Sequence, residues 1–138
     1  MPMMTNFNIA GSALSAQSVR LNTVASNLAN THSVASSPEE VYKPRVPVFQ
    51  TQSESFQGQL ELAGVKIAGI VESTAEPFME YQPDHPLADE KGYIYKPAIN
   101  EVEEMANMIS ASQSYAGNVE VMNTTKQLIL QTLQMGQG

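Results

Sequence analysis

The residues of this chain that could do chemistry gather in one short, proline-rich segment. His85 lies beside Asp84, and Asp89 and Glu90 follow within five residues. One imidazole and several carboxylates are groups that bind cations, and they could also supply the acid and base of a hydrolase. Nothing in their spacing forces them to converge. We therefore expect a solvated turn here, with no metal, no cofactor and no small-molecule substrate.

Other catalytic arrangements find no support in the sequence. The chain has no cysteine, which excludes disulfides, thiolate zinc sites and cysteine nucleophiles. It contains neither a G-x-S-x-G nucleophile motif nor a glycine-rich phosphate loop. Glu103 and Glu104 are adjacent acids, but consecutive helical residues point about 100° apart, and a position in the first turn of a helix explains them better. We predict that the protein is not an enzyme.

The charges are unevenly distributed along the 138 residues. The net charge is −7, which gives no general support for binding nucleic acid. All 14 acidic residues lie between Glu39 and Glu120, whereas residues 1–38 hold a single cation, Arg20. An ordinary solvated helix carries lysine and glutamate on its outer face. Unless this is an accident of composition, the uncharged ends are helices packed against protein on several sides, where unpaired charge is costly.

The sequence has no obvious membrane or secretion segment. No run approaches the roughly 18 apolar residues of a membrane helix, so we expect no membrane insertion. The N-terminus lacks a basic stretch followed by an apolar core, and we expect no cleaved secretory signal. Taken alone, these features indicate a cytoplasmic protein.

Residues 6–30 predict a helix whose N-cap is Thr5 or Asn6. Apolar residues recur every seven positions in it, at Phe7, Leu14, Leu21 and Leu28. A repeat of seven against 3.6 residues per turn favours left-handed supercoiling with a partner helix. The alternative is an amphipathic helix that lies on a globular core.

The middle of the chain has a different composition. Residues 31–41 are polar and predict a loop, and residues 42–97 contain six of the eight prolines. Alternating apolar and polar residues predict short strands, with a bulge or turn at Gly64 and an edge strand near Pro47. The expected strands are 46–49, 60–62, 65–67 with an extension to 71, and 93–95.

A second, longer helix is expected from about Glu101 to Gln134. Asn100 is its predicted N-cap, and glutamates in the first turn suit the helix dipole. Three adjacent heptad stripes in it are largely apolar, more than one coiled-coil seam needs. At 1.5 Å per residue it would span roughly 50 Å.

The expected fold is therefore mainly α with a small β-rich insertion, and the terminal helices pair as an antiparallel coiled-coil hairpin. Residues 1–34 and 99–138 would form the coiled-coil assembly domain, and residues 35–98 the proline-rich loop and β insertion. We expect contacts within and between subunits at Phe7, Leu14, Leu21, Val24, Leu28, Val102, Met105, Ile109, Ala116, Val119, Met122, Leu130 and Leu133. Four asparagines would satisfy buried polar groups and fix the register: Asn22, Asn27, Asn30 and Asn123.

Several segments resemble the flagellar rod and hook family of axial proteins. Residues 13–22 (ALSAQSVRLN) and 25–31 (ASNLANT) are similar to the N-terminal signature of that family. Residues 81–93 (YQPDHPLADEKGY) resemble a loop of its proximal rod members, as do segments 102–105, 110–115 and 118–124. The chain departs from the family pattern at residues 42–45 (YKPR), where the family has a tyrosine followed by basic residues and this chain has Pro44 between Lys43 and Arg45.

This resemblance implies a structural subunit of the bacterial flagellum. Such subunits are exported by the flagellar type III apparatus with an uncleaved N-terminal signal. The lack of a cleaved secretory signal is therefore compatible with a location outside the cytoplasm. They assemble in the periplasm into the hollow, helical rod of the basal body, which transmits torque from the motor to the hook. The implied partners are further copies of the chain, neighbouring rod proteins and, during transit, the export apparatus.

Three alternatives remain open. One is another rod or hook member; the short middle of this chain disfavours the distal rod and hook proteins, which carry much larger insertions between the helices. A coiled-coil component of a non-flagellar secretion system would not be expected to contain the 81–93 segment. The third alternative is a small hydrolase that uses Asp84, His85 and Asp89.

Overall fold

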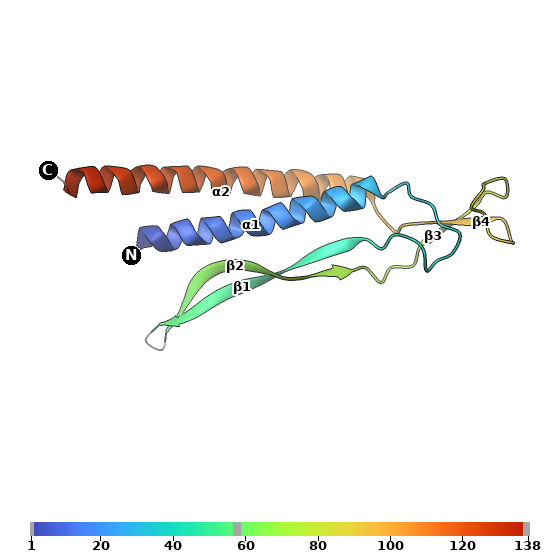
Figure 1. Cartoon of the computed structure of the whole chain (residues 1–138), viewed down its shortest axis with the longest axis horizontal. Coiled ribbons are helices and arrows are strands. Elements are labelled where there is room, and N and C mark those ends of the chain that lie inside the picture. Colours follow the sequence, from blue (N-terminus) through green and yellow to red (C-terminus); the bar gives the residue numbers. More distant parts are fainter. Residues whose placement is uncertain (1, 57–58, 137–138) are drawn as a thin grey trace.

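Two antiparallel helices form the long axis of the molecule, and the chain between them folds into two β-hairpins (Figure 1). The computed structural model describes residues 2–56 and 59–136. Helix α1 spans Pro2–Ala29 and helix α2 spans Glu101–Gly136. The hairpin of β1 (Arg45–Phe56) and β2 (Gln59–Glu72) lies along α1, and the hairpin of β3 (Phe78–Tyr81) and β4 (Tyr93–Lys96) lies at one end of the molecule.

Helix α1 begins earlier than the sequence predicted. Thr5 and Asn6 are not N-caps, because the helix is already formed at Pro2. A proline suits the first helical turn, since its ring presets φ and its missing N–H would have had no partner within the helix. The end at Ala29 agrees with the prediction to within one residue.

Helix α2 begins where its capping residue predicted. The Asn100 side-chain oxygen accepts hydrogen bonds from the backbone N–H groups of Val102 (3.1 Å) and Glu103 (3.3 Å). These bonds satisfy two of the four free donors at the start of the helix. With 36 residues α2 is about 54 Å long, against about 42 Å for the 28 residues of α1. The C-terminal turns of α2 therefore extend past the start of α1 (Figure 1).

The pairing of the two terminal helices agrees with the expected helical hairpin. On α2 a narrow face turns inward, with Ala111 fully buried and Thr125 nearly so. The half-buried residues of the same face follow the spacing of a helix stripe: Glu104, Asn107, Met108, Ser114, Asn118, Met122 and Ile129. The small side chain of Ala111 allows the helices to approach closely.

The strands are longer than predicted. Segments 60–62 and 65–67 are not separate strands, because β2 runs without a break for 14 residues opposite β1. The bulge predicted at Gly64 is confirmed: Gln52 pairs with Gly64 and Ser53 with Leu62, so one residue of β2 has no partner between them. A bulge admits the extra residue without ending the ladder and increases the strand twist.

The second hairpin includes a strand that the sequence analysis missed, β3, paired with the expected β4. The loop after α1 joins this sheet at one point, because Ala35 and Tyr95 exchange two backbone hydrogen bonds of 2.9 and 3.1 Å. Ile94 (1% exposed) and Val41 (6% exposed) are buried in this part of the molecule. The described part of the middle region thus contains two small antiparallel sheets joined by loops.

Candidate functional site: assembly surfaces

The most prominent feature of the single chain is how much of its surface is uncovered. A compact monomer of 15.0 kDa exposes roughly 7,000 Å², whereas this chain exposes 9628 Å². The surplus of roughly 2,600 Å² exceeds the ~800 Å² that each partner buries in a standard interface. The chain therefore has enough unburied surface for contacts with more than one neighbour.

Much of the exposed apolar surface lies on α2. Val102 is 76% exposed and Ile109 58% exposed, and five more of the predicted interface residues are also exposed: Met105, Ala116, Val119, Leu130 and Leu133. Within one chain these residues do not form the seam with α1 that we had expected, because the inner face of α2 is centred on Ala111 instead. Their contribution to contacts between subunits remains a prediction.

The other predicted interface residues lie nearer the core. Val24 is buried, and Phe7, Leu14, Leu21, Leu28 and Met122 are half-buried. The sequence did not decide between the three apolar stripes of α2, because each has the period that a helix partner requires. The buried residues Ala111 and Thr125 belong to none of these three stripes, so the inner face is centred on a line of residues that was not predicted. Of the three stripes, only the one that contains Met108, Met122 and Ile129 lies beside it.

The four asparagines have different environments. Asn22 and Asn123 are exposed, and Asn30 donates a 2.8 Å hydrogen bond to the carbonyl oxygen of Ser26, one turn earlier in α1. Asn27 differs from them because only 1% of its surface is exposed. A buried amide of this kind must find partners for two donors and an acceptor with two lone pairs.

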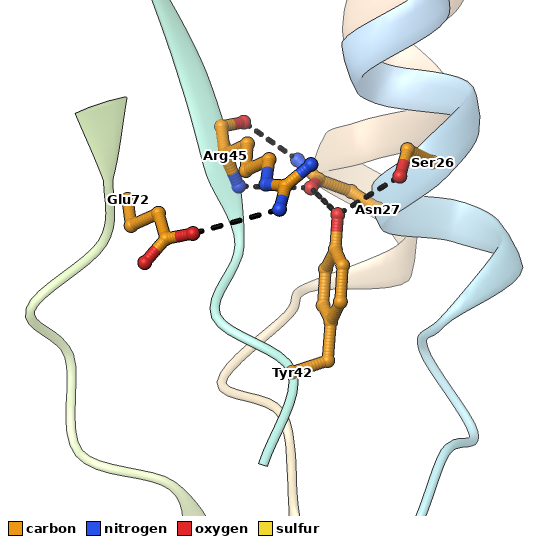
Figure 2. Close-up of polar contacts among 5 residues, drawn as sticks. All are labelled: Ser26, Asn27, Tyr42, Arg45 and Glu72. Carbon is orange, nitrogen blue, oxygen red and sulfur yellow. Dashed lines mark hydrogen bonds and ion pairs between the residues drawn. The ribbon is translucent and has the colours of Figure 1, made fainter. Parts of the chain in front are cut away.

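Asn27 has all four of these partners. Its Oδ1 accepts from the Arg45 N–H (2.9 Å) and the Tyr42 hydroxyl (3.0 Å). Its Nδ2 donates to the Arg45 carbonyl oxygen (2.9 Å) and to Oε2 of Glu104 (3.1 Å). Since the Tyr42 hydroxyl donates to Asn27, its 3.0 Å contact with Ser26 makes the serine the donor. Figure 2 shows Ser26, Asn27, Tyr42 and Arg45 converging between α1 and the start of β1.

The Asn27 amide thus pairs with the Arg45 backbone as a neighbouring strand would, with one donated and one accepted bond. It occupies the free edge of β1 at the base of the long hairpin and also reaches the first turn of α2. Arg45 additionally forms an ion pair with Glu72 across the hairpin at 3.6 Å, as Figure 2 shows. Both partners of that pair are half-exposed, so it adds little stability.

A second junction joins the same hairpin to α1 nearer its N-terminus. The Ser12 hydroxyl donates to the carbonyl oxygen of Ile9 (2.7 Å) and accepts the backbone N–H of Val65 (3.1 Å). The neighbouring Gly64 is buried and has a φ of +133°. A Cβ atom at this position would lie 2.3 Å from the Ser12 hydroxyl oxygen. Only glycine permits both this backbone conformation and this approach of strand to helix.

The cluster of acids and His85 is organised as a turn. Asp89 Oδ1 accepts the N–H groups of Lys91 and Tyr93, both at 2.8 Å, and its Oδ2 accepts the Tyr95 hydroxyl at 3.1 Å. The bond from Tyr93, followed by those from Lys91 and Tyr95, lowers the pKa of Asp89 below its ordinary value. The pKa of Tyr95 is raised, chiefly because its hydroxyl donates to Asp89. His85 accepts the N–H of Leu87 through Nδ1.

Among residues 2–56 and 59–136 there is no group of three or more histidine or acidic side chains placed to hold a metal ion. Within the same residues, no helix combines the length and the apolar character that crossing a membrane requires.

Sequence reasoning missed Ser12, Tyr42 and Arg45 as residues that join the elements. A short polar side chain on a helix gave no sign of which distant backbone it would meet. Tyr42 and Arg45 precede the strand expected at 46–49, and no role was predicted for either residue.

Comparison with known proteins gives two family matches within the chain. Residues 7–31 match the family described as "Flagella basal body rod protein". Residues 90–135 match the family described as "Flagellar basal body rod FlgEFG protein C-terminal". The two matched regions contain most of α1 and most of α2.

Whole proteins also match over almost their entire length. The flagellar basal-body rod protein FlgC of Yersinia enterocolitica is 48% identical over 137 residues, covering 99% of this chain and 100% of that protein. FlgC of Salmonella typhimurium is 46% identical with the same coverage. FlgC of Bacillus subtilis is 34% identical over 144 residues, covering 95% of this chain and 96% of that protein.

Proposed function

Because the chain belongs to the FlgC family of flagellar basal-body rod proteins, we propose that it polymerises through the exposed apolar stripe of α2 and the outer side of α1. The protein is a structural subunit of the flagellar basal-body rod. Its proposed partners are further copies of itself and neighbouring rod proteins, with no nucleic acid, membrane or small-molecule substrate.

The observation that carries this proposal is the uncovered stripe on α2. Residues from Val102 to Leu133 keep a largely apolar heptad pattern on a side of the helix that α1 does not cover, with interruptions at Ser112, Asn123 and Lys126. Exposed apolar patches of this length mark protein–protein contacts. Because the stripe runs almost the full ~54 Å of the helix, a neighbouring helix can lie against it over several turns.

We further propose that these contacts between subunits have coiled-coil geometry. The period of seven in both helices favours left-handed supercoiling, and the exposed Asn22 and Asn123 would set the register between subunits. Head-to-tail contacts that do not close into a ring generate helical assemblies. A rod of this kind would act as the drive shaft that passes torque from the motor to the hook.

The proposed location is the periplasmic rod, reached by type III export without a cleaved signal. We propose no catalytic activity. Both carboxylate oxygens of Asp89 are occupied by hydrogen bonds within the turn, which suits a structural role. If the protein were a small hydrolase, replacing Asp84, His85 and Asp89 together by alanine would abolish its hydrolytic activity. The rod proposal predicts that the triple variant loses no turnover and still assembles into the rod.

The direct experiment is deletion of the gene in its host, with complementation by the wild-type gene. Swimming in soft agar and images of purified basal bodies provide the readout. We expect membrane rings without a completed rod, and loss of swimming. Normal rods in the deletion strain, with no second flagellar system present, would contradict the proposal.

A substitution tests the helix contacts themselves. Leu21→Asp places a charge among apolar residues of α1, and we expect loss of incorporation and of swimming. Wild-type swimming in this strain would rule out the proposed seam.

A further inference from the structure

We infer that Asn27 and Ser12 are positioning residues that hold the β1–β2 hairpin at a fixed angle to the helices, and that a neighbouring copy of this chain in the rod recognises this fixed position. The inference rests on the proposed function, and it adds the hairpin to the helices as a surface that assembly requires.

The first argument is that the hairpin has little else to hold it. Within residues 2–56 and 59–136 it is a two-stranded sheet with no third strand, and isolated hairpins of this kind are marginally stable in water. The described residues of β1 are mostly exposed, including Val46, Val48 and Phe49. An apolar core under the hairpin is therefore small, and specific polar contacts must fix its position.

The second argument is the placement of those contacts. Asn27 and Ser12 lie 15 residues apart on α1, roughly 22 Å along the helix. Asn27 meets the backbone of β1 at Arg45, whereas Ser12 meets the backbone of β2 at Val65. Two separated contacts, one on each strand, prevent rotation that a single contact would allow.

The third argument concerns the way the hairpin lies in the molecule. Its two strands cross over each other as they run along α1 (Figure 1). This twist brings the edge of β1 to the helix at the base and the edge of β2 to the helix further along. The bulge at Gly64 lies next to the second contact, where glycine permits the close approach.

The hairpin also carries apolar side chains that need a neighbour. Val46, Val48, Phe49, Ile70 and Val71 are between 41% and 56% exposed. A second copy of this chain is the occupant that the exposed area favours, because the surplus of roughly 2,600 Å² exceeds the ~800 Å² that each partner buries in one standard interface. If the hairpin were free to rotate, this apolar surface would have no defined orientation for a neighbour to match.

The test measures hairpin position in the isolated full-length protein. The chain has no cysteine, so spin labels at Thr51→Cys on β1 and Gln113→Cys on α2 report one distance. Labels at Ser18→Cys and Lys126→Cys report the helix pair. Asn27→Asp keeps the side-chain volume but removes both amide donors, and Ser12→Ala removes the acceptor for Val65. The matched controls are Asn8→Asp and Ser15→Ala, which change exposed residues of the same helix.

We expect Asn27→Asp and Ser12→Ala to broaden and shift the hairpin distance while the helix-pair distance and the helical circular dichroism stay at wild-type values. Both controls should match the wild type. If Asn27→Asp loses its helical signal, Ser12→Ala still decides the matter. The inference would be overturned if the hairpin distance stayed narrow and unchanged in Ser12→Ala and also stayed so in a second variant that disturbs the Asn27 contacts. That second variant is Asn27→Asp or, if it does not fold, Tyr42→Phe.

A second readout separates this inference from the proposed function. The same variants are introduced into the deletion strain and scored for incorporation into basal bodies. We expect loss of incorporation in proportion to the broadening of the hairpin distance. Variants with a loosened hairpin that build normal rods would overturn the inference and leave the rod function intact. Normal rods in the deletion strain without any copy of the gene would instead contradict the rod function itself.

Discussion

Gly64 and Ser12 are so close that a Cβ atom at position 64 would lie 2.3 Å from the serine hydroxyl oxygen. The same glycine has a φ of +133°, which residues with a side chain rarely adopt. The backbone conformation and the contact with α1 therefore both require a residue without a side chain at position 64 of β2. The relationship shows how a bulge in a strand and a small polar residue in a helix together bring two elements into contact.

Gly64→Ala should lower the free energy of unfolding by about 1–3 kcal/mol, because alanine would be strained at this φ and would collide with Ser12. Urea denaturation of the isolated protein measures the change. Gly69→Ala is the matched control in the same strand, since a Cβ there would have no atom within 4 Å. Equal stability of the two variants would contradict the close approach of β2 to α1.

Tyr42→Phe removes the hydroxyl that donates to Asn27 and leaves one lone pair of the buried amide without its partner. The expected loss of stability is about 0.5–1.5 kcal/mol, the usual net contribution of one hydrogen bond. Tyr115→Phe, at an exposed position of α2, serves as the control and should change stability little. A Tyr42→Phe variant as stable as wild type would mean that the Asn27 cluster does not depend on this hydroxyl.

Asp89 and Tyr95 should make the turn before β4 sensitive to pH in both directions. Because the pKa of Asp89 is lowered, the stability that its carboxylate gives to the turn is fully present above the ordinary aspartate pKa of about 3.9. This stability is lost as the pH falls through the lower pKa that Asp89 has in the folded protein. Because the pKa of Tyr95 is raised, the stability that its protonated hydroxyl gives to the turn is fully present below the ordinary tyrosine pKa of about 10. This stability is lost as the pH rises through the higher pKa that Tyr95 has in the folded protein.

Exchange of the Tyr93 amide hydrogen, followed by NMR, measures this dependence because that N–H donates to Asp89. We expect protection of the amide between these limits and a loss of protection in acid. Asp89→Asn should abolish the acid transition, whereas Asp84→Asn, an exposed change in the same segment, should leave it in place. Persistence of the acid transition in Asp89→Asn would assign it to another group.

Ile109→Asn tests the stripe on α2 without disturbing the fold of the single chain. The side chain is 58% exposed, so the isolated protein should keep its stability to within about 0.5 kcal/mol, as surface substitutions usually do. Incorporation into rods should fall sharply, because an amide would replace an apolar contact between subunits. Imaging of basal bodies from the complemented deletion strain measures this.

Ser110→Asn is the control for that experiment, since residue 110 is also exposed but points about 100° away around the helix. It should assemble normally. If Ile109→Asn also assembles normally, the stripe is not the contact surface between subunits.

The sequence determined the two helices, because their signals are local. Asn100 acts as an N-cap through hydrogen bonds to residues two and three positions later, and the apolar repeat of α1 relates residues in neighbouring turns. The bulge at Gly64 also follows from a local preference of glycine. The expectation of a broken β2 was wrong because a ladder of backbone bonds to β1 continues through the irregularity, and the sequence of one strand does not reveal its partner.

Only the tertiary structure decided which apolar stripe of α2 faces α1 and what Asn27 binds. The predicted stripes have the same period, and the buried face of α2 is centred on Ala111 and Thr125, which lie outside all three of them. The partners of Asn27 lie 15 to 77 residues away in the chain, at Tyr42, Arg45 and Glu104. A buried amide must satisfy its hydrogen bonds, which the sequence implies, but which groups satisfy them depends on the packing of distant elements.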